Sequence, residues 1–330
     1  MATPHNLTYK QQMKQLEELG MIINSKELKK PTKLEIIGYY KIKEFSLPFL
    51  HKGRYNGVRL KSIANRFYLD KNLRMHFLQA IEKIELSLKI KLSYLFTNEY
   101  KDFGYLDFAN WFSKASGKDF IKKQELLFKK KIRHSMKKSS NPEYKNKVNL
   151  NKEGLPSAWF GISLLMFGDI EFIIKNLSRK NAIKLAKEYH LDYKTLLSVV
   201  GLVHLARNIC CHNQNLVDVK IKTQPNVRKL FRNANEIMYE YSGNQKASKQ
   251  CKMVSNGLAM VTLCVKYMVD EIDSDYDWDD IISDIVELAH PVSKNGGELY
   301  HHMGFKSARS LRYLFPKNKR DLKRAQRRAS

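Results

Sequence analysis

The sequence predicts an all-α fold, and three observations support that prediction. Apolar residues recur at three- and four-residue steps along most of the 330 residues, which is the spacing of one face of an α-helix. The stretch from Val58 to Tyr100 contains neither Gly nor Pro, so nothing in it interrupts a long helix. Alternating apolar and polar residues between paired turn signals, the pattern of strands, are scarce. We therefore expect a helical bundle.

The N-terminal helices are placed by their start signals. Thr8 is a suitable N-cap for a helix through Leu16 to Met21. Pro31 and Thr32 open a second helix. Its apolar face holds Leu34, Ile37, Tyr40 and Ile42.

The rest of the bundle is predicted from apolar periodicity. In the long stretch after Val58, one stripe is formed by Leu73, Phe77, Ile81, Ile84 and Leu88. Six more helices are expected over 159–177, 179–189, 193–212, 227–241, 252–272 and 278–289.

Charge is the outlying property of the composition. Fifty-nine Lys and Arg against 33 Asp and Glu give a net charge of +26 and a pI near 9.7. Such a field attracts polyanions, so nucleic acid is the expected partner and an anionic membrane surface is the alternative. The hydrophobic share of 43% excludes a globally disordered chain.

Charge also divides the chain. Residues 114–152 hold 13 Lys or Arg and three acids, which predicts a basic insertion, part helix and part loop. Residues 270–287 hold nine acids and no base, and 317–330 form a basic tail. We expect a helical domain over 1–244, a C-terminal helical extension over 245–316, and the tail. The acidic stretch is interpreted as a solvated face, with a mask over the basic insertion as the alternative.

The cellular location is predicted to be the cytoplasm. The start of the chain is polar and lacks the apolar core of a signal peptide. The longest uncharged stretch, 154–168, is too short to span a bilayer. The four cysteines form no C-x-x-C pair, and we expect them to be reduced. No metal or other cofactor is expected.

One segment has the residue types of a catalytic site. Arg207 and Asn208 precede His212 in an Arg-x4-His pattern at the end of an apolar helix. Asn208 and His212 are four apart and share a helical face, so the amide can orient the imidazole. Arg207 lies about 140° around the axis from His212. With 15 Arg and 10 His, about one Arg-x4-6-His match is expected by chance; the adjacent Asn and the helix-end position make coincidence far less frequent.

These three residues suit cleavage of RNA. The 2′-hydroxyl of RNA can attack the adjacent phosphate if a base takes its proton, and a His can do so or protonate the leaving 5′-oxygen. Arg suits the extra charge on the phosphorane because its planar fork binds two oxygens. The alternative is structural: Arg207 forms an ion pair and His212 caps a helix C-terminus.

Several separated motifs resemble one protein family. In chain order they are Ile37-Gly38-Tyr39-Tyr40-Lys41-Ile42, Leu47-Pro48-Phe49, Tyr68-Leu69-Asp70-Lys71-Asn72-Leu73-Arg74, Ala80-Ile81-Glu82-Lys83-Ile84-Glu85, Pro156-Ser157-Ala158-Trp159, Met166-Phe167-Gly168-Asp169, and Arg207-Asn208 with His212. They resemble the Abi-like proteins (AbiD/AbiF type) of bacterial abortive-infection phage defence, within the HEPN superfamily. The resemblance spans about residues 10–240. Residues 213–215, Asn-Gln-Asn, replace the basic and aromatic residues that often follow the family's His.

The resemblance implies both a fold and an activity. HEPN proteins are helical, commonly dimeric, and many are metal-independent ribonucleases that use Arg-x4-6-His. It implies that Arg207, Asn208 and His212 are the catalytic residues, in a composite site formed by two copies. Some family members work with a small structured RNA encoded beside them, so such an RNA and a homodimer are the implied partners.

The remaining candidates concern RNA binding. The basic insertion and tail are the predicted RNA contacts, with an ordinary solvated lysine face as the alternative: Lys129, Lys130, Lys131, Arg133, Lys137, Lys138, Arg320, Lys323, Arg324, Arg327 and Arg328. Four aromatic residues could stack on bases, but their helical spacing beside Leu and Ile predicts core positions: Tyr39, Tyr40, Trp159 and Phe167.

Two more groups of polar residues have a structural and a functional interpretation. Arg74 with Glu82 and Glu85 is interpreted as ion pairs that brace helices, with a polar shell around the active site as the alternative. His204, two turns before His212, is expected to be a core histidine with its hydrogen bonds satisfied.

Three functions compete. The first is a metal-independent endoribonuclease of phage defence, controlled by an RNA partner. The second is an RNA-binding scaffold that uses Arg207 and His212 only to grip phosphate. The third is a scaffold at a membrane surface, which the lack of an amphipathic anchor or an acylation signal disfavours.

Overall fold

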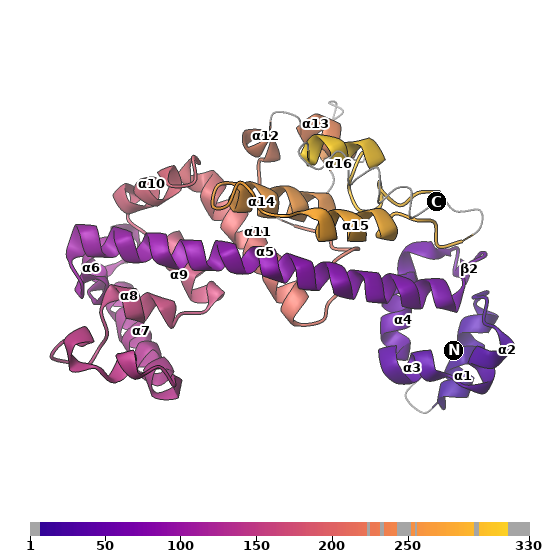
Figure 1. Ribbon diagram of the computed structural model, residues 1–330, viewed down its shortest axis with the longest axis horizontal. Helices are drawn as coiled ribbons and strands as arrows, with labels where there is room; N and C mark the ends of the chain where they lie inside the picture. Colours follow the sequence, from indigo (N-terminus) through magenta and orange to yellow (C-terminus); the bar gives the residue numbers. More distant parts are fainter. Residues whose placement is uncertain are drawn as a thin grey trace. The chain divides into compact units, whose positions relative to one another are not determined.

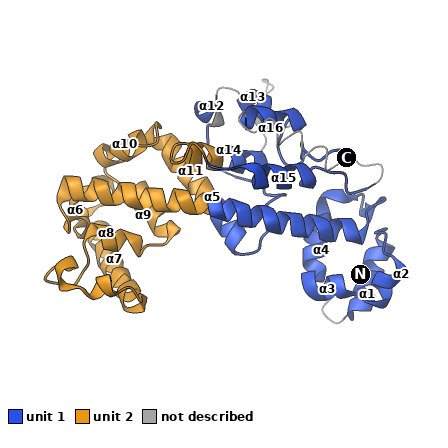
Figure 2. Cartoon of the chain, in the orientation of Figure 1, with its two compact units in different colours: residues 1–79, 206–263, 276–330 blue, residues 80–205, 264–275 orange. Residues whose placement is uncertain are grey.

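The computed structural model describes residues 7–222, 225–231, 234–242, 252–254, 256–293 and 297–315 (Figure 1). The predicted all-α fold is confirmed, since helices make up most of these residues and the strands among them form two short antiparallel pairs. The chain divides into two compact units (Figure 2). Unit 1 comprises 1–79, 206–263 and 276–330, and unit 2 comprises 80–205 and 264–275. The helices α5, α11 and α14 contribute residues to both units.

The N-terminal part of unit 1 confirms the predicted start signals and corrects one helix. Thr8 caps α1 in a reciprocal capping box with Gln11. The second predicted helix is divided in two, because Gly38 adopts a φ of +88°, which ends α3. The elements are α1 (Tyr9–Glu18), α2 (Ser25–Lys29), α3 (Thr32–Ile37), α4 (Tyr39–Ser46), β1 (Leu50–His51) and β2 (Arg54–Tyr55).

The stretch without Gly and Pro forms one helix, α5 (Leu60–Tyr100). Its 41 residues extend about 60 Å at 1.5 Å per residue. The predicted apolar stripe is buried along its whole length, as expected of the face that packs against the core: Leu73, Phe77, Ile81, Ile84 and Leu88.

Unit 2 has an aromatic core. The ring of Phe96 on α5 lies 5.2 Å from Trp111, and Phe108 lies 5.2 Å from Phe128. Phe128 belongs to the basic segment, which therefore supplies part of this core. Residues 159–177, predicted as one helix, form two helices separated by Leu164–Met166. The helices are α6 (Phe108–Trp111), α7 (Lys118–Lys138), α8 (Ala158–Ser163), α9 (Phe167–Asn176) and α10 (Arg179–Lys187).

The C-terminal half departs most from the predicted boundaries. The expected helix over 227–241 is two short helices followed by a strand, and the one over 252–272 begins with a strand and becomes helical at Leu258. The elements are α11 (Tyr193–Cys211), α12 (Val227–Leu230), α13 (Ala234–Ile237), β3 (Glu240–Ser242), β4 (Lys252–Val254), α14 (Leu258–Asp270), α15 (Asp279–Leu288) and α16 (Ala308–Leu314). The basic tail residues, Arg320, Lys323, Arg324, Arg327 and Arg328, lie outside the described residues.

Two of the four aromatic residues predicted for the core are exposed. Tyr39 and Phe167 are buried, but Tyr40 is 57% exposed and Trp159 is 38% exposed. Each exposed residue directly follows a buried one, Tyr39 or Ala158, and adjacent residues lie about 100° apart around a helix, so they cannot share the buried face. The helical spacing was therefore a wrong guide for Tyr40 and Trp159.

Part of the acidic stretch is not solvated. Asp284 is buried and hydrogen-bonded to Nδ1 of His76 at 2.7 Å, whereas Asp273 forms a partly exposed ion pair with Lys83 at 3.0 Å. Burial raises the pKa of Asp284 to about 6, against the lowering effect of His76. The solvated face predicted for 270–287 is thus wrong at Asp284.

One helix of the described chain, α11, is long and apolar enough to cross a membrane. Half of that stretch is buried inside the protein, which is the pattern of a core helix.

Candidate active site

The C-terminus of α11 places His212 at the surface. Asn213 adopts the left-handed conformation with φ +53°, and the N–H of Gln214 donates to the carbonyl of Ile209 at 3.0 Å. This pair of features is a Schellman motif, in which the residue before the left-handed position closes the helix. That residue is His212, whose N–H donates to the Asn208 carbonyl at 3.0 Å. His212 is exposed just after the last helical residue.

The side chains of Arg207 and Asn208 lie one turn before His212. Nη1 of Arg207 is 3.5 Å from Oδ1 of Asn208, at the outer limit of a hydrogen bond. Both side chains are half-buried. The structure therefore brings a guanidinium and an amide together at the end of α11. The orientation of the imidazole by Asn208 remains a prediction.

A buried carboxylate of α5 holds the segment that follows His212. Oδ1 of Asp70 accepts the N–H groups of Leu216 at 3.0 Å and Val217 at 2.8 Å, and its Oδ2 accepts Nε of Arg74 at 2.9 Å. Asp70 is fully buried. Burial raises its pKa to about 6, and the hydrogen bonds from Val217, Arg74 and Leu216 oppose that rise. Asp70 thus fixes the loop behind His212 to a rigid helix.

A second carboxylate fixes the end of the same loop. Asp218 accepts Nη2 of Arg66 at 2.6 Å and Nδ2 of Asn215 at 2.7 Å, and its Oδ1 lies 2.6 Å from Nε2 of His302. Burial acts to raise the pKa of Asp218, but the hydrogen bond from His302, the charge of Arg66 and the amide of Asn215 outweigh it and lower this pKa. Asp218 therefore connects α5, the loop and the C-terminal segment.

Side chains of α5 and of the C-terminal segment therefore hold residues 212–218 in place. Arg66, Asp70 and Arg74 follow each other at four-residue steps, which places them on one face of α5. Within the described ranges, Nε of Arg66 and Nη2 of Arg74 are buried and have no hydrogen-bond partner. The loop is thus backed by a buried cluster rich in guanidinium donors.

The comparison with protein families identifies the family of this chain. The family model described as Abi-like protein matches residues 32–218, more than half of the chain. The chain belongs to the Abi-like protein family. This is a family of abortive-infection phage defence. No curated protein and no solved structure matches the chain.

The matched region of this Abi-like protein includes the whole candidate site except one residue. It begins before α5 and ends at Asp218, so it contains Asp70, Arg207 and His212. His302 lies outside it, although its side chain contacts Asp218. The C-terminal segment of this Abi-like protein therefore adds a residue to the support of the loop.

The structure separates the six predicted RNA contacts that lie on α7 into two groups. Lys129 pairs with Glu125 at 2.8 Å, Lys131 with Asp169 at 2.5 Å, and Arg133 with Glu153 at 3.6 Å. The other three are exposed and form no ion pair with any described residue: Lys130, Lys137 and Lys138. Half of the cluster is therefore partly neutralised by neighbouring acids.

Specific contacts test the structural interpretations of Arg74 and His204. Arg74 does form an ion pair within its helix, but with Asp70 at 2.9 Å, and Glu85 pairs with Lys89 at 2.8 Å. His204 has its Nδ1 bonded to Glu171, and its ring stacks on Phe167 at 5.3 Å. Gly168 leaves room for that imidazole, since a Cβ there would lie 3.3 Å from Cε1 of His204. His204 is thus held by partners, as expected.

Sequence reasoning missed four residues of the site: Arg66, Asp70, Asp218 and His302. The four-residue spacing of Arg66, Asp70 and Arg74 was a signal, because charges on one face of an otherwise apolar helix need partners. No signal marked His302, whose partner is 84 residues away in sequence. Among the residues that the structure describes, no three His, Cys, Asp or Glu side chains gather as metal ligands would.

Proposed function

We propose that this Abi-like protein is a metal-independent endoribonuclease of phage defence, with a HEPN-type site formed by Arg207, Asn208 and His212. The observation that carries the proposal is the end of α11. There an exposed His212 stands in a turn closed by Asn213, one turn after the adjoining guanidinium and amide. Phosphodiester transfer requires a base and a cation that meet at one phosphate, and the end of α11 offers both groups.

The proposed reaction uses a nucleophile that RNA itself supplies. His212 takes the proton of a 2′-hydroxyl, whose oxygen attacks the adjacent phosphorus, and Arg207 stabilises the charge on the phosphorane. The bond to the 5′-oxygen breaks, and that oxygen takes up a proton. The products are a 2′,3′-cyclic phosphate and a 5′-hydroxyl. Asp70 holds the loop behind the base but touches no substrate.

We also propose a composite site in a cytoplasmic homodimer. Arg207 and His212 are about 140° apart around a helix, so a second copy would supply the group that one copy cannot bring to the same phosphate. The net charge of +26 supports an RNA partner, and a small structured RNA that controls the enzyme is part of the proposal.

The test is cleavage by the full-length chain, with RNA from uninfected and phage-infected cells and in the presence of a chelator. His212→Ala is expected to lower the rate about 10²- to 10⁴-fold and Arg207→Ala about 10²- to 10³-fold. Asn208→Ala should lose less, because it removes no reacting group. A 2′-deoxy nucleotide at the cut site should block the reaction. His290→Ala, at another exposed histidine of unit 1, should cleave as the wild type does.

An equal cleavage rate of wild type and His212→Ala under every activating condition would exclude the nuclease. The second candidate, an RNA-binding scaffold, would then hold if the wild type binds RNA. The specific observation in its favour is a group of exposed lysines on α7 that form no ion pair with any described residue: Lys130, Lys137 and Lys138. They could contact phosphates without any catalytic group.

A further inference from the structure

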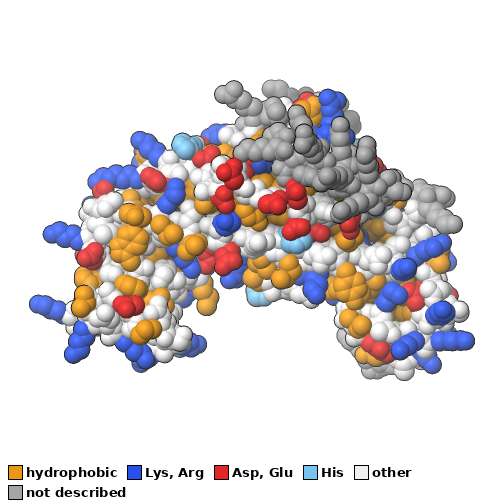
Figure 3. Space-filling model, in the orientation of Figure 1, with side chains coloured by type: hydrophobic (Ala, Val, Ile, Leu, Met, Phe, Trp, Pro, Cys, Tyr) orange, Lys and Arg blue, Asp and Glu red, His pale blue; other side chains and the backbone are white. Residues whose placement is uncertain are grey.

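The unit 2 part of α5 carries a row of large apolar side chains on its solvent side. Leu86 is 57% exposed, Ile90 42% and Tyr94 55%, and their four-residue spacing places them along one face. Figure 3 shows hydrophobic side chains gathered over this part of α5, with Lys and Arg side chains around them. Such a row is a candidate binding surface, whereas single exposed apolar residues are common on any protein.

The row ends in an aromatic pair. The ring of Tyr94 lies 4.6 Å from that of Trp159 on α8, at an interplanar angle of 84°. In such an edge-to-face pair, one ring keeps both faces clear of its partner and the other keeps one face clear. Because both rings are also exposed to solvent, a further flat ring can stack on the pair.

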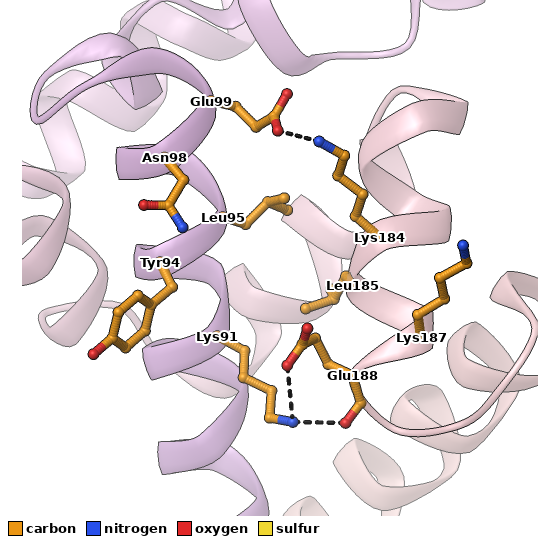
Figure 4. Close-up of a pocket in the computed structure, with 9 residues that line it drawn as sticks. All are labelled: Lys91, Tyr94, Leu95, Asn98, Glu99, Lys184, Leu185, Lys187 and Glu188. Carbon is orange, nitrogen blue, oxygen red and sulfur yellow. Dashed lines mark hydrogen bonds and ion pairs between the residues drawn. The ribbon is translucent and has the colours of Figure 1, made fainter.

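A basic groove adjoins Tyr94 (Figure 4). It lies between α5 and α10 and has a volume of about 460 Å³, within the range of pockets that hold small molecules or single nucleotides. Leu95 and Leu185 form its apolar floor, while Lys91 meets Glu188 and Lys184 meets Glu99 across it. Tyr94 lines the groove through its position on α5, but its ring points away from Lys184 and Lys187, to the other side of the helix.

The charges around the groove favour an anionic ligand. Three lysines, Lys91, Lys184 and Lys187, line it against two glutamates, Glu99 and Glu188. Lys187 forms no ion pair with a described residue, and Lys180 adds a further positive charge next to Glu99 at 2.8 Å.

We propose that Tyr94, Trp159 and the adjoining lysines Lys91, Lys184 and Lys187 form a binding surface for single-stranded RNA. A base stacks on the aromatic pair, and the strand crosses α5 so that phosphates further along it lie at the lysines of the groove. Stacking on an aromatic ring tolerates any base, and lysines contact the backbone without reading sequence. The proposal rests on the proposed function, because it takes RNA as the substrate, and it assigns the substrate's unpaired strand to unit 2.

The experiment measures binding of a fluorescein-labelled, 2′-O-methyl 12-nucleotide single strand to the full-length chain. The 2′-O-methyl groups prevent cleavage through the 2′-oxygen. Tyr94→Leu keeps an apolar, helix-forming side chain and removes the ring; it should weaken binding about ten- to hundredfold. Tyr94→Phe, which keeps the ring, should bind within about twofold of the wild type. The matched control is Tyr40→Leu, since Tyr40 is 57% exposed on a helix of unit 1; its affinity should not change.

Two further readouts locate the contact. Ultraviolet crosslinking followed by peptide mass spectrometry should place the RNA on the peptides that contain Tyr94 or Trp159. Lys187→Gln should lower the slope of log K against log salt by about 0.7, the value for one phosphate contact to a single strand. Lys26→Gln, at an exposed lysine of α2, should leave the slope unchanged.

The outcomes separate this proposal from the nuclease proposal. If the wild type cleaves RNA through His212 but Tyr94→Leu binds as tightly as the wild type, the RNA surface is wrong and the nuclease stands. If Tyr94→Leu changes the sedimentation of the protein and leaves RNA affinity unaltered, the surface is an interface between copies and the proposal is overturned. If the wild type neither binds nor cleaves RNA, the proposed function fails, and the RNA surface fails with it.

Discussion

At the residue scale, a single buried carboxylate decides where His212 stands. Asp70 accepts two backbone N–H groups from the loop after α11 and one N–H from Arg74. Each of these donors would otherwise be buried without a partner, at a cost of about 1–3 kcal/mol. Asp70 is therefore a positioning residue for the candidate base, although it touches no substrate.

The titration of Asp70 predicts a measurable pH dependence. Burial raises its pKa to about 6, above the usual value near 4. The folded state therefore holds a proton that the unfolded state has released between about pH 4 and 6. The stability that this proton contributes is fully present below pH 4 and is lost as the pH rises through 6.

Asp70→Asn, which cannot titrate, isolates that contribution. On going from pH 7 to pH 4, the wild type should gain up to about 3 kcal/mol in unfolding free energy relative to the variant. Urea unfolding at several pH values measures the difference, and Glu35→Gln, at an exposed acid of α3, is the control. Parallel curves for wild type and Asp70→Asn would show that Asp70 has an ordinary pKa.

At the element scale, the end of α11 holds the proposed catalytic residues, and the surface of α7 holds proposed RNA contacts. The Schellman motif stops α11 at Cys211, so the next residue projects into solvent instead of continuing the apolar helix. The motif also explains the polar residue after His212, because Asn tolerates the left-handed conformation better than most residues. A basic or aromatic residue at this position would adopt the left-handed conformation less readily than Asn.

Substitution of Asn213 tests the turn. Asn213→Val places a β-branched side chain at a φ of +53° and should destabilise the protein by about 1–2 kcal/mol. It should also lower RNA cleavage, because the turn that presents His212 is distorted. Asn213→Gly, which adopts this conformation freely, should keep both properties. Thermal unfolding and a cleavage assay measure the two effects; equal values for the Val and Gly variants would show that the turn does not depend on residue 213.

The helix α7 provides a second element-scale test. Lys130, Lys137 and Lys138 are exposed and form no ion pair with a described residue, whereas Lys129 and Lys131 pair with acids. Replacing the exposed three by Gln should lower the salt slope of RNA binding by about 2, at roughly 0.7 per phosphate contact. Replacing Lys129 and Lys131 by Gln should lower the salt slope by less than replacing two of the exposed lysines does. Fluorescence titrations from low to high salt measure the slope, and an unchanged slope for the triple variant would remove α7 from the RNA surface.

At the scale of the whole molecule, two compact units share three helices, and neither unit is a continuous stretch of chain. The family match ends at Asp218, but unit 1 is completed by residues after 276. Through His302, this later segment holds the same carboxylate that closes the candidate catalytic loop. The C-terminal part of the chain therefore belongs to the support of the site.

The composite site predicts the assembly of the whole molecule. The chain of 38.6 kDa should sediment as a dimer in the presence of RNA, because Arg207 and His212 of one copy lie about 140° apart around a helix. Sedimentation equilibrium at several protein concentrations, with and without a non-cleavable RNA, measures the mass. Full cleavage activity by a chain that stays monomeric at the assay concentration would contradict the composite site.

The sequence alone determined the fold class, the position of α11 and the candidate residues at its end. These follow from local rules: periodicity sets the helices, Thr8 and Pro31 mark helix starts, and the Arg-x4-His pattern is read along the chain. Helix boundaries after Val227 were predicted poorly, because short helices and strands there are stabilised by residues distant in sequence.

The tertiary structure decided what the charged and aromatic residues do. Whether a lysine is free or neutralised depends on acids from other segments, as Asp169 shows for Lys131. Exposure of Trp159 beside Tyr94, and the convergence of Arg66 and His302 on Asp218, likewise depend on how distant segments pack. Local sequence fixes dihedral angles and faces, but burial and pairing are properties of the packed chain, because they depend on which distant atoms displace water.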